Sequence, residues 1–147
     1  MKVFRNIISP IVGIVVYFIV VTIGMFAVDY VASGAYSLIV NVHEQNPYNP
    51  TVQLIGMAVV RIIAIMFAAA TSNKVCIPLK NGFLIGPFVY GLIVFAFAST
   101  SLLSLIPATF SEPSLKHIVC LIEEISKAFL AITFIISGIK GEDLEII

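Results

Sequence analysis

The chain has 147 residues, of which 60% are hydrophobic and 11% are charged, and its mean hydropathy is +1.11. About a quarter of the residues of a soluble domain are charged, so the composition excludes an ordinary soluble domain and indicates an integral membrane protein. The formal net charge is zero and no run of four Lys or Arg residues occurs. Because the chain has no basic surface to attract nucleic acid, we expect no nucleic-acid partner. We expect the lipid bilayer to surround the protein, and we expect no cofactor.

Four apolar segments follow one another along the sequence. They predict an all-α, integral membrane bundle of four transmembrane helices that forms a single domain over residues 1–147. A hydrocarbon core of about 30 Å needs about 20 helical residues to cross it, and each segment is long enough. The predicted spans are about 7–30 or 7–40, 52–71, 83–106 and 115–139. Since these helices take up most of the chain, we expect short loops.

The first apolar segment has two alternative lengths because it is longer than a bilayer requires. About 34 residues in one straight helix would extend about 50 Å, so the segment must tilt, protrude or break. The predicted bend is Ser33-Gly34, because long helices kink at small, flexible residues. With that bend, residues 30–42 form an outer continuation or an interfacial helix.

The positions of the basic residues predict the orientation of the bundle. Five of them lie before the first segment, between the second and third segments, or after the fourth: Lys2, Arg5, Lys74, Lys80 and Lys140. The two remaining connections together carry Lys116 alone. By the positive-inside rule, both termini and the middle connection are cytoplasmic, and in a bacterium the membrane would be the inner one.

Five ionisable residues lie inside the predicted spans: Asp29, Arg61, Glu123, Glu124 and Lys127. A charge in hydrocarbon costs at least a few kcal/mol, so it must be paired, hydrated or used. Counted from the outer ends of the helices, four of the five lie about 12–17 Å deep, and the lysine lies about one turn deeper. We therefore predict a polar layer in the outer half of the bundle, with Glu123 at its edge.

Helical periodicity adds further polar side chains to this layer. At about 100° per residue, the helix faces that carry the charges, together with one side of the third helix, also carry Thr22, Tyr90, Thr100, Ser101, Ser104, His117 and Cys120. Small and polar residues mark the sides of membrane helices that face other helices, so these side chains are expected to line the interior. No second His or Cys stands at ligand spacing from the histidines, and we predict no metal site.

Two functional hypotheses follow from the charged layer. If all five groups are ionised, the carboxylates outnumber the cations by one, which makes a glutamate a candidate to carry a proton or bind a cation. The first hypothesis is therefore a small transporter or channel subunit that binds an ion, a proton or a small polar solute at this layer. An enzyme is less favoured, because no nucleophile, base and orienting group stand at recognisable spacing.

The alternative is a non-catalytic accessory or assembly subunit whose charges only hold helices together. Glu123 and Glu124 then pair with Lys127 along one helix. Arg61 pairs with Asp29 between two helices, or the charges pair with those of a partner. Under either hypothesis, four thin helices leave little interior volume, so we expect a homo-oligomer or a place in a larger membrane complex.

Overall fold

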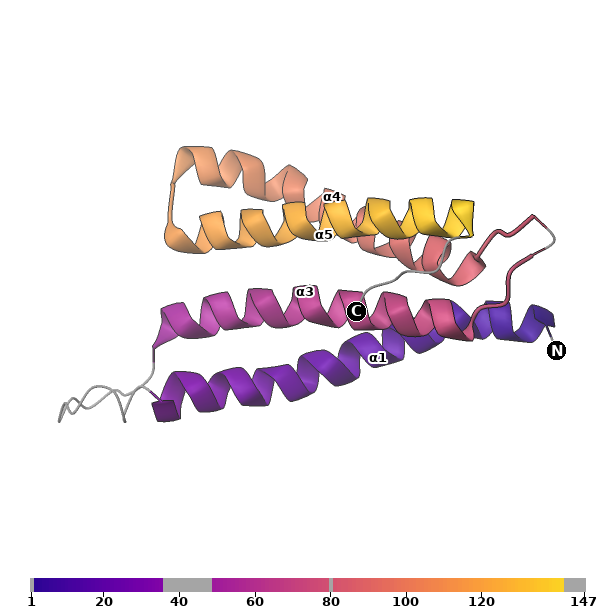
Figure 1. Ribbon diagram of the computed structural model, residues 1–147. Coiled ribbons are helices and arrows are strands. Elements are labelled where there is room, and N and C mark those ends of the chain that lie inside the picture. Colours follow the sequence, from indigo (N-terminus) through magenta and orange to yellow (C-terminus); the bar gives the residue numbers. More distant parts are fainter. Residues whose placement is uncertain (1, 36–48, 80, 142–147) are drawn as a thin grey trace.

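The computed structural model describes residues 2–35, 49–79 and 81–141, and the regular elements within these ranges are all helical. Helix α1 (Lys2–Tyr30) runs into a short π-helical segment, η1 (Val31–Ala35). The long helices that follow are α3 (Pro50–Val75), α4 (Ile85–Ser111) and α5 (Leu115–Lys140). Figure 1 shows the four long helices running in alternating directions along one axis.

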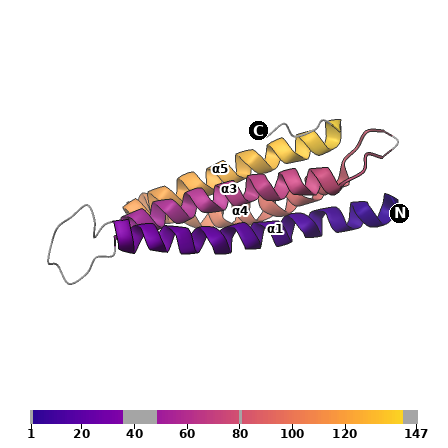
Figure 2. The ribbon, with the colours of Figure 1, turned by 60° about the horizontal axis from the view of Figure 1, so that its bottom comes forward.

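The two ends of the bundle are distinct. The start of α1, the α3–α4 connection and the end of α5 lie at one end, which we call the terminal end (Figure 2). The opposite end, where α1 gives way to α3 and α4 to α5, we call the far end. If the predicted orientation holds, the terminal end is cytoplasmic.

Three of the four long helices are long and apolar enough to cross a membrane: Val3–Ser33, Pro50–Val75 and Ile85–Ser111. Helix α5 has a similar length of 26 residues. Every stretch of 18 residues within it, however, contains Glu123, Glu124 and Lys127. The apolar helices are compatible with a multi-pass membrane protein, whereas the fourth span and the orientation of the termini stay predictions.

The third predicted span is longer in the structure than its sequence suggests. Helix α4 passes through Pro107 and ends at Ser111, beyond the predicted end at residue 106, so only residues 112–114 connect it to α5. A proline removes one backbone donor from a helix, and membrane helices tolerate this loss. In the turn that follows, the hydroxyl of Thr109 donates to the carbonyl of Leu105 at 2.8 Å. The proline that predicted a loop therefore lies inside a continuing helix.

The first helix changes from α-helical to π-helical geometry around the predicted bend. Its α-helical turns end at Tyr30, and the π-helical segment that follows contains Ser33-Gly34. The backbone N–H of Asn49 donates to the carbonyl of Ala32 at 3.3 Å, so the start of α3 lies beside the end of this helix. The choice between the two predicted lengths depends on residues 36–40, which lie outside the described residues, and stays open. The predicted interfacial helix falls mainly on residues 36–48, outside the described residues.

The helices pack as two antiparallel pairs, α1 with α3 and α4 with α5 (Figure 1). In the first pair, a Cβ atom added to Gly24 would lie 2.3 Å from a methyl group of Val60, and one added to Gly56 would lie 2.8 Å from Val28. In the second pair, Gly91 lies against the backbone of α5. Glycine lets two membrane helices approach this closely, so each pair depends on its glycines.

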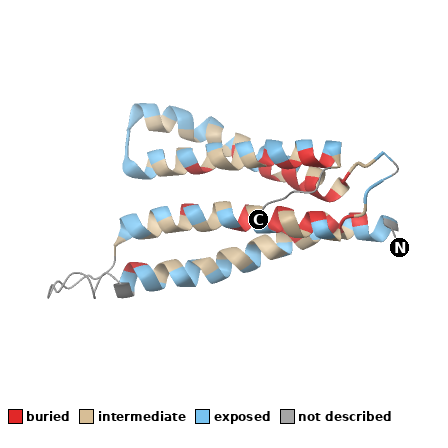
Figure 3. Cartoon of the chain, viewed as in Figure 1, coloured by how far each residue is buried: buried red, intermediate tan, exposed pale blue. Residues whose placement is uncertain are grey.

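The buried core lies in the half of the bundle nearer the terminal end (Figure 3). It joins α3, α4 and α5 through Ile65, Ala68, Ala69, Tyr90, Val94, Ala131 and Phe134. At the terminal end, the hydroxyl of Ser9 on α1 donates to the carbonyl of Ser72 on α3 at 2.5 Å, and Gly86 of α4 lies against both serines. Toward the far end most side chains are exposed or half-buried, and within the described residues no Cα atom of α1 lies within 8 Å of one in α5. The two pairs are therefore joined mainly at one end.

The contact between Gly24 and Val60 provides a test of the first pair. We expect Gly24→Ala to lower the free energy of unfolding by about 1 kcal/mol, because the added carbon would overlap the Val60 side chain, which can partly give way. With Val60→Ala in the same chain, the nearest atom would be Cβ of residue 60 at 3.2 Å.

The combined loss should therefore be smaller than the sum of the two single losses by about 0.5–1 kcal/mol. Unfolding by SDS in dodecyl maltoside micelles measures all three variants. Strictly additive losses would contradict the packing of Gly24 against Val60.

Candidate functional site

Four charged side chains from α3 and α5 form one continuous cluster, which we call the ion-pair network: Arg61, Glu123, Lys127 and Glu124. Nη1 of Arg61 lies 3.0 Å from Oε2 of Glu123 and 3.1 Å from Oε1. Oε1 of Glu123 lies 2.5 Å from Nζ of Lys127, which is 2.7 Å from Oε1 of Glu124. Two carboxylates face two cations, so the fully ionised network carries no net charge.

Glu123 is the centre of this network. Its carboxylate bonds both cations, and its side chain is 3% exposed, compared with 38% for Arg61. Lys127 lies one turn further along the same face of α5, whereas Arg61 reaches Glu123 from α3. A buried carboxylate is tolerable only when it is paired and hydrogen-bonded. The bond from Arg61 to Glu123 therefore satisfies this charge and ties the two helical pairs together beside the core.

The structure places Asp29 outside the network. Its Oδ1 accepts a hydrogen bond from Nε2 of Gln53 at 3.1 Å. Gln53 stands about eight residues before Arg61 on α3, which puts this bond about 12 Å nearer the far end. The predicted depth of Asp29 assumed a helix that continues to residue 40, but the α-helical turns end at Tyr30. Without Asp29, the predicted excess of negative charge is absent from the network.

Most of the predicted polar lining does not face a shared interior. Three exposed hydroxyls donate to a carbonyl three or four residues earlier in their own helix, as such side chains commonly do: Thr22, Thr100 and Ser104. Nδ1 of His117 lies 2.8 Å from the carbonyl oxygen of Glu112, at the start of α5. Cys120 is a half-buried free thiol. Tyr90 and Ser101 do line a cavity with part of the network.

Two cavities border the network. The first, which we call the Arg61 cleft, has a volume of about 620 Å³ and is lined by residues that include Met25, Gln53, Leu54, Met57, Arg61 and Lys116. The second, which we call the Tyr90 cavity, has a volume of about 370 Å³ and is lined by Tyr90, Ser101, Glu124 and Lys127 among others from all four long helices. One side chain of the network thus faces the cleft, two face the cavity, and Glu123 joins them.

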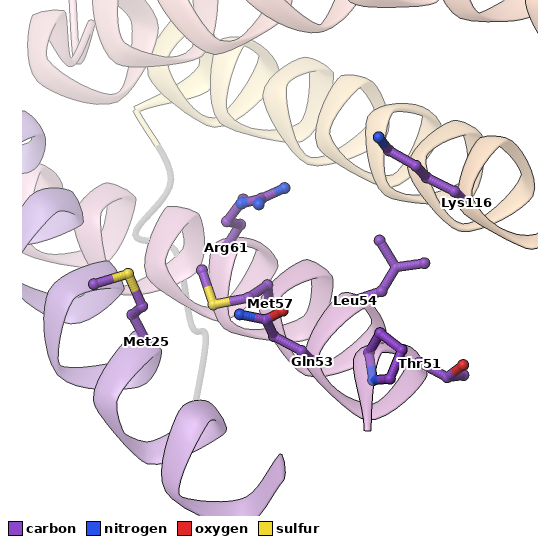
Figure 4. A pocket seen from close by; sticks show the side chains of 8 residues that line it. Met25, Thr51, Gln53, Leu54, Met57, Arg61 and Lys116 are labelled. Carbon is purple, nitrogen blue, oxygen red and sulfur yellow. The ribbon is translucent and has the colours of Figure 1, made fainter. Parts of the chain in front are cut away.

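The guanidinium of Arg61 extends from α3 into the cleft on the side of α5, which carries Lys116 (Figure 4). A guanidinium has N–H donors on three nitrogens, and Nη1 is the one that bonds Glu123. Within the described part of the chain, Nε and Nη2 have no hydrogen-bond partner. Part of this cation is therefore left to bind water or a ligand.

No protein family model, no curated protein and no solved structure matches the chain. Function must therefore be inferred from the geometry of the network and its two cavities. Among the residues that the structure describes, no group of three or more His, Cys, Asp or Glu side chains is placed to hold a metal ion.

Sequence reasoning missed Lys116 as a site residue, because it counted this lysine only as a charge of the outer connections. Lys116 lies in the first turn of α5, about two helical turns before Glu123 and on the same side of the helix. Gln53 was missed too, although it lies about two turns before Arg61 on α3. In both cases the spacing from a network residue was a signal that could have found the side chain.

Proposed function

We propose that this chain is a four-span membrane protein with cytoplasmic termini, acting as a small transporter or channel subunit. In this proposal an ion or a small polar solute binds at the ion-pair network, and the far end with its Arg61 cleft faces outward. Helix α5 would be about 39 Å long and thus able to span the bilayer. Its buried charges are paired with one another and with Arg61, which lowers the cost of placing them in the membrane.

One observation carries the proposal: a single buried carboxylate bonds two cations that line different cavities. Arg61 lines the cleft, Lys127 lines the Tyr90 cavity, and both bond Glu123. An anion bound in the cleft would compete with Glu123 for the guanidinium. Lys127 would then hold Glu123 more tightly and Glu124 less tightly. Charge in one cavity is thereby coupled to charge in the other, as transport across a bilayer requires.

The same bond gives the proposal a mechanical element. Arg61 and Glu123 connect the α1–α3 pair to the α4–α5 pair at the edge of the core. Without this bond, the pairs would still be joined through the core and through Gly86 of α4, which lies against Ser72 of α3. Movement of packed helices about such a joint is a known route to alternating access. Occupancy of the cleft would then control how far the pairs separate.

A second candidate is the accessory or assembly subunit. It is favoured by the complete pairing of the network, since each of its four charges has a partner within the chain. Large apolar side chains are also exposed along all the long helices, where lipid or a partner could cover them. This candidate predicts co-purification with a larger assembly in a mild detergent and no solute flux by the isolated protein.

Flux through phosphatidylcholine vesicles distinguishes the two candidates. We expect the purified protein to raise proton flux, reported by pyranine, or chloride flux, reported by lucigenin, above that of empty vesicles. Glu124→Gln should reduce this flux by about tenfold, the effect of about 1.4 kcal/mol, because the variant removes the carboxylate that lines the Tyr90 cavity. Lys127 keeps its bond to Glu123 in this variant, so folding should be preserved.

The matched control is Glu112→Gln, which removes an exposed carboxylate from the α4–α5 connection. It should leave the flux unchanged. If vesicles with the wild-type protein showed neither proton nor chloride flux above that of empty vesicles, the transport proposal would be contradicted and the accessory subunit favoured. An unaltered flux in Glu124→Gln would have the same consequence.

A further inference from the structure

We infer that the Arg61 cleft binds an oxyanion attached to an apolar group. Arg61 and Lys116 would hold the carboxylate or phosphate, and Leu54 with Met25 and Met57 would contact the apolar part. If the bound anion is also the transported solute, the inference rests on the proposed function. Binding of the anion to the cleft can be measured without any flux.

The first argument is the unused part of the Arg61 guanidinium. Nη1 is engaged by Glu123, whereas Nε and Nη2 have no partner within the described residues. These two nitrogens form one edge of the planar group, and such an edge matches the two oxygens of a carboxylate or phosphate. The side chain is 38% exposed, so a ligand in the cleft can reach this edge while the bond to Glu123 is retained.

The second argument is a local excess of positive charge. The ion-pair network is neutral, and Lys116 adds a cation that has no ion-pair partner among the described residues. The carboxylates near the cleft are already occupied: Glu123 bonds two cations, and Asp29 accepts from Gln53. Among the described residues that line the cleft, an anion would therefore meet two cations and no carboxylate. Because Lys116 is exposed and Arg61 is partly exposed, this attraction should weaken as the salt concentration rises.

The third argument is the apolar wall of the same cleft. Met25, Leu54 and Met57 line it beside the two cations. Methionine side chains adapt to ligands of irregular shape, and a volume of about 620 Å³ lies within the range of small-molecule sites. The N-terminus of α3 is not the anion partner, because the side chain of Asn49 already accepts from its first N–H groups. A purely inorganic anion would leave the apolar wall unused.

Such a ligand could come from solution, as an organic carboxylate, or from the membrane, as an anionic lipid headgroup. Two measurements on the full chain in dodecyl maltoside separate these sources. Isothermal titration calorimetry with benzoate, corrected for the heat measured with empty micelles, tests whether the cleft binds a soluble carboxylate. Native mass spectrometry with dioleoyl phosphatidic acid, against dioleoyl phosphatidylcholine, tests the lipid source.

The variants are Lys116→Gln, Arg61→Lys and the matched control Lys74→Gln. Lys116 is exposed and lies outside the network, so its replacement should leave the fold intact while weakening binding by about tenfold, or about 1.4 kcal/mol. Arg61→Lys keeps the charge that pairs with Glu123 but lacks the planar edge, and we expect it to lose measurable binding. Lys74 lies at the terminal end of α3, far from the cleft, and its replacement should have no effect.

Binding of benzoate, or retention of phosphatidic acid over phosphatidylcholine, with this order of variants would support the site and identify its source. Absence of both, or equal losses in Lys116→Gln and Lys74→Gln, would overturn it. If Arg61→Lys fails to fold, the loss of binding in Lys116→Gln, compared with Lys74→Gln, decides whether the site exists. Anion binding without proton or chloride flux would contradict the transport proposal and support the binding site. Flux that depends on Glu124, without anion binding, would support the transport proposal and contradict the binding site.

Discussion

Glu123→Gln should lower the free energy of unfolding by about 3–5 kcal/mol, the loss that follows when one partner of a buried ion pair is removed. The variant would leave Arg61 without its carboxylate and Lys127 with Glu124 alone. It would also release the bond that ties the two helical pairs together. SDS titration in dodecyl maltoside micelles measures this loss, and a fall in melting temperature should accompany it.

Glu124→Gln is the matched comparison, because it changes the neighbouring residue in the same way. Glu124 has one partner, Lys127, which keeps its bond to Glu123. We therefore expect a loss of about 1 kcal/mol, in the range of a single hydrogen bond to a charged group. Equal losses in Glu124→Gln and Glu123→Gln would contradict the central position of Glu123 in the network.

Gly91→Ala should destabilise the α4–α5 pair by about 3 kcal/mol, at the upper end of the range for overpacking. The added carbon would lie 2.9 Å from the carbonyl oxygen of Ala131 and 3.1 Å from the backbone nitrogen of Ile135. Backbone atoms cannot rotate away as a side chain can, so the helices themselves would have to separate. The same SDS titration measures the effect.

Ala96→Leu serves as the control for Gly91→Ala. Ala96 is exposed on the same helix, so a larger side chain there should change the free energy of unfolding by less than about 0.5 kcal/mol. Equal stability of Gly91→Ala and the wild type would show that α4 and α5 are not packed this closely.

Hydropathy along the chain was sufficient to predict the helices. The long elements lie where the apolar segments are, because a span must bury its backbone hydrogen bonds within one helix wherever lipid replaces water. Their ends were harder to predict. The third span was predicted to end at residue 106, but α4 continues through Pro107 to Ser111, and the first helix leaves its α-helical form at Tyr30. Such ends depend on contacts with neighbouring helices as well as on local residue preference.

The rotation of α5 shows why the centre of the site could not be predicted. The sequence predicted Glu123 at the edge of the polar layer, whereas the buried residues of this helix include Glu123 and Phe134. In a membrane, lipid is as apolar as the protein core, so a large apolar side chain gives no signal of which way it faces. Adjacent residues of a helix are rotated by about 100° around its axis. An error of one residue in the rotation of α5 therefore put Glu124 in the place of Glu123.

The sequence by itself determined that this is a helical, apolar chain with a few charges inside its hydrophobic segments, because a segment's residues decide whether it is apolar and whether it carries charges that need a partner or water. The tertiary structure alone decided that Glu123 joins Arg61 to Lys127, that Asp29 pairs with Gln53, and that Lys116 lines the cleft. These outcomes depend on which helices pair and how each is rotated, and such contacts lie between residues far apart in the chain.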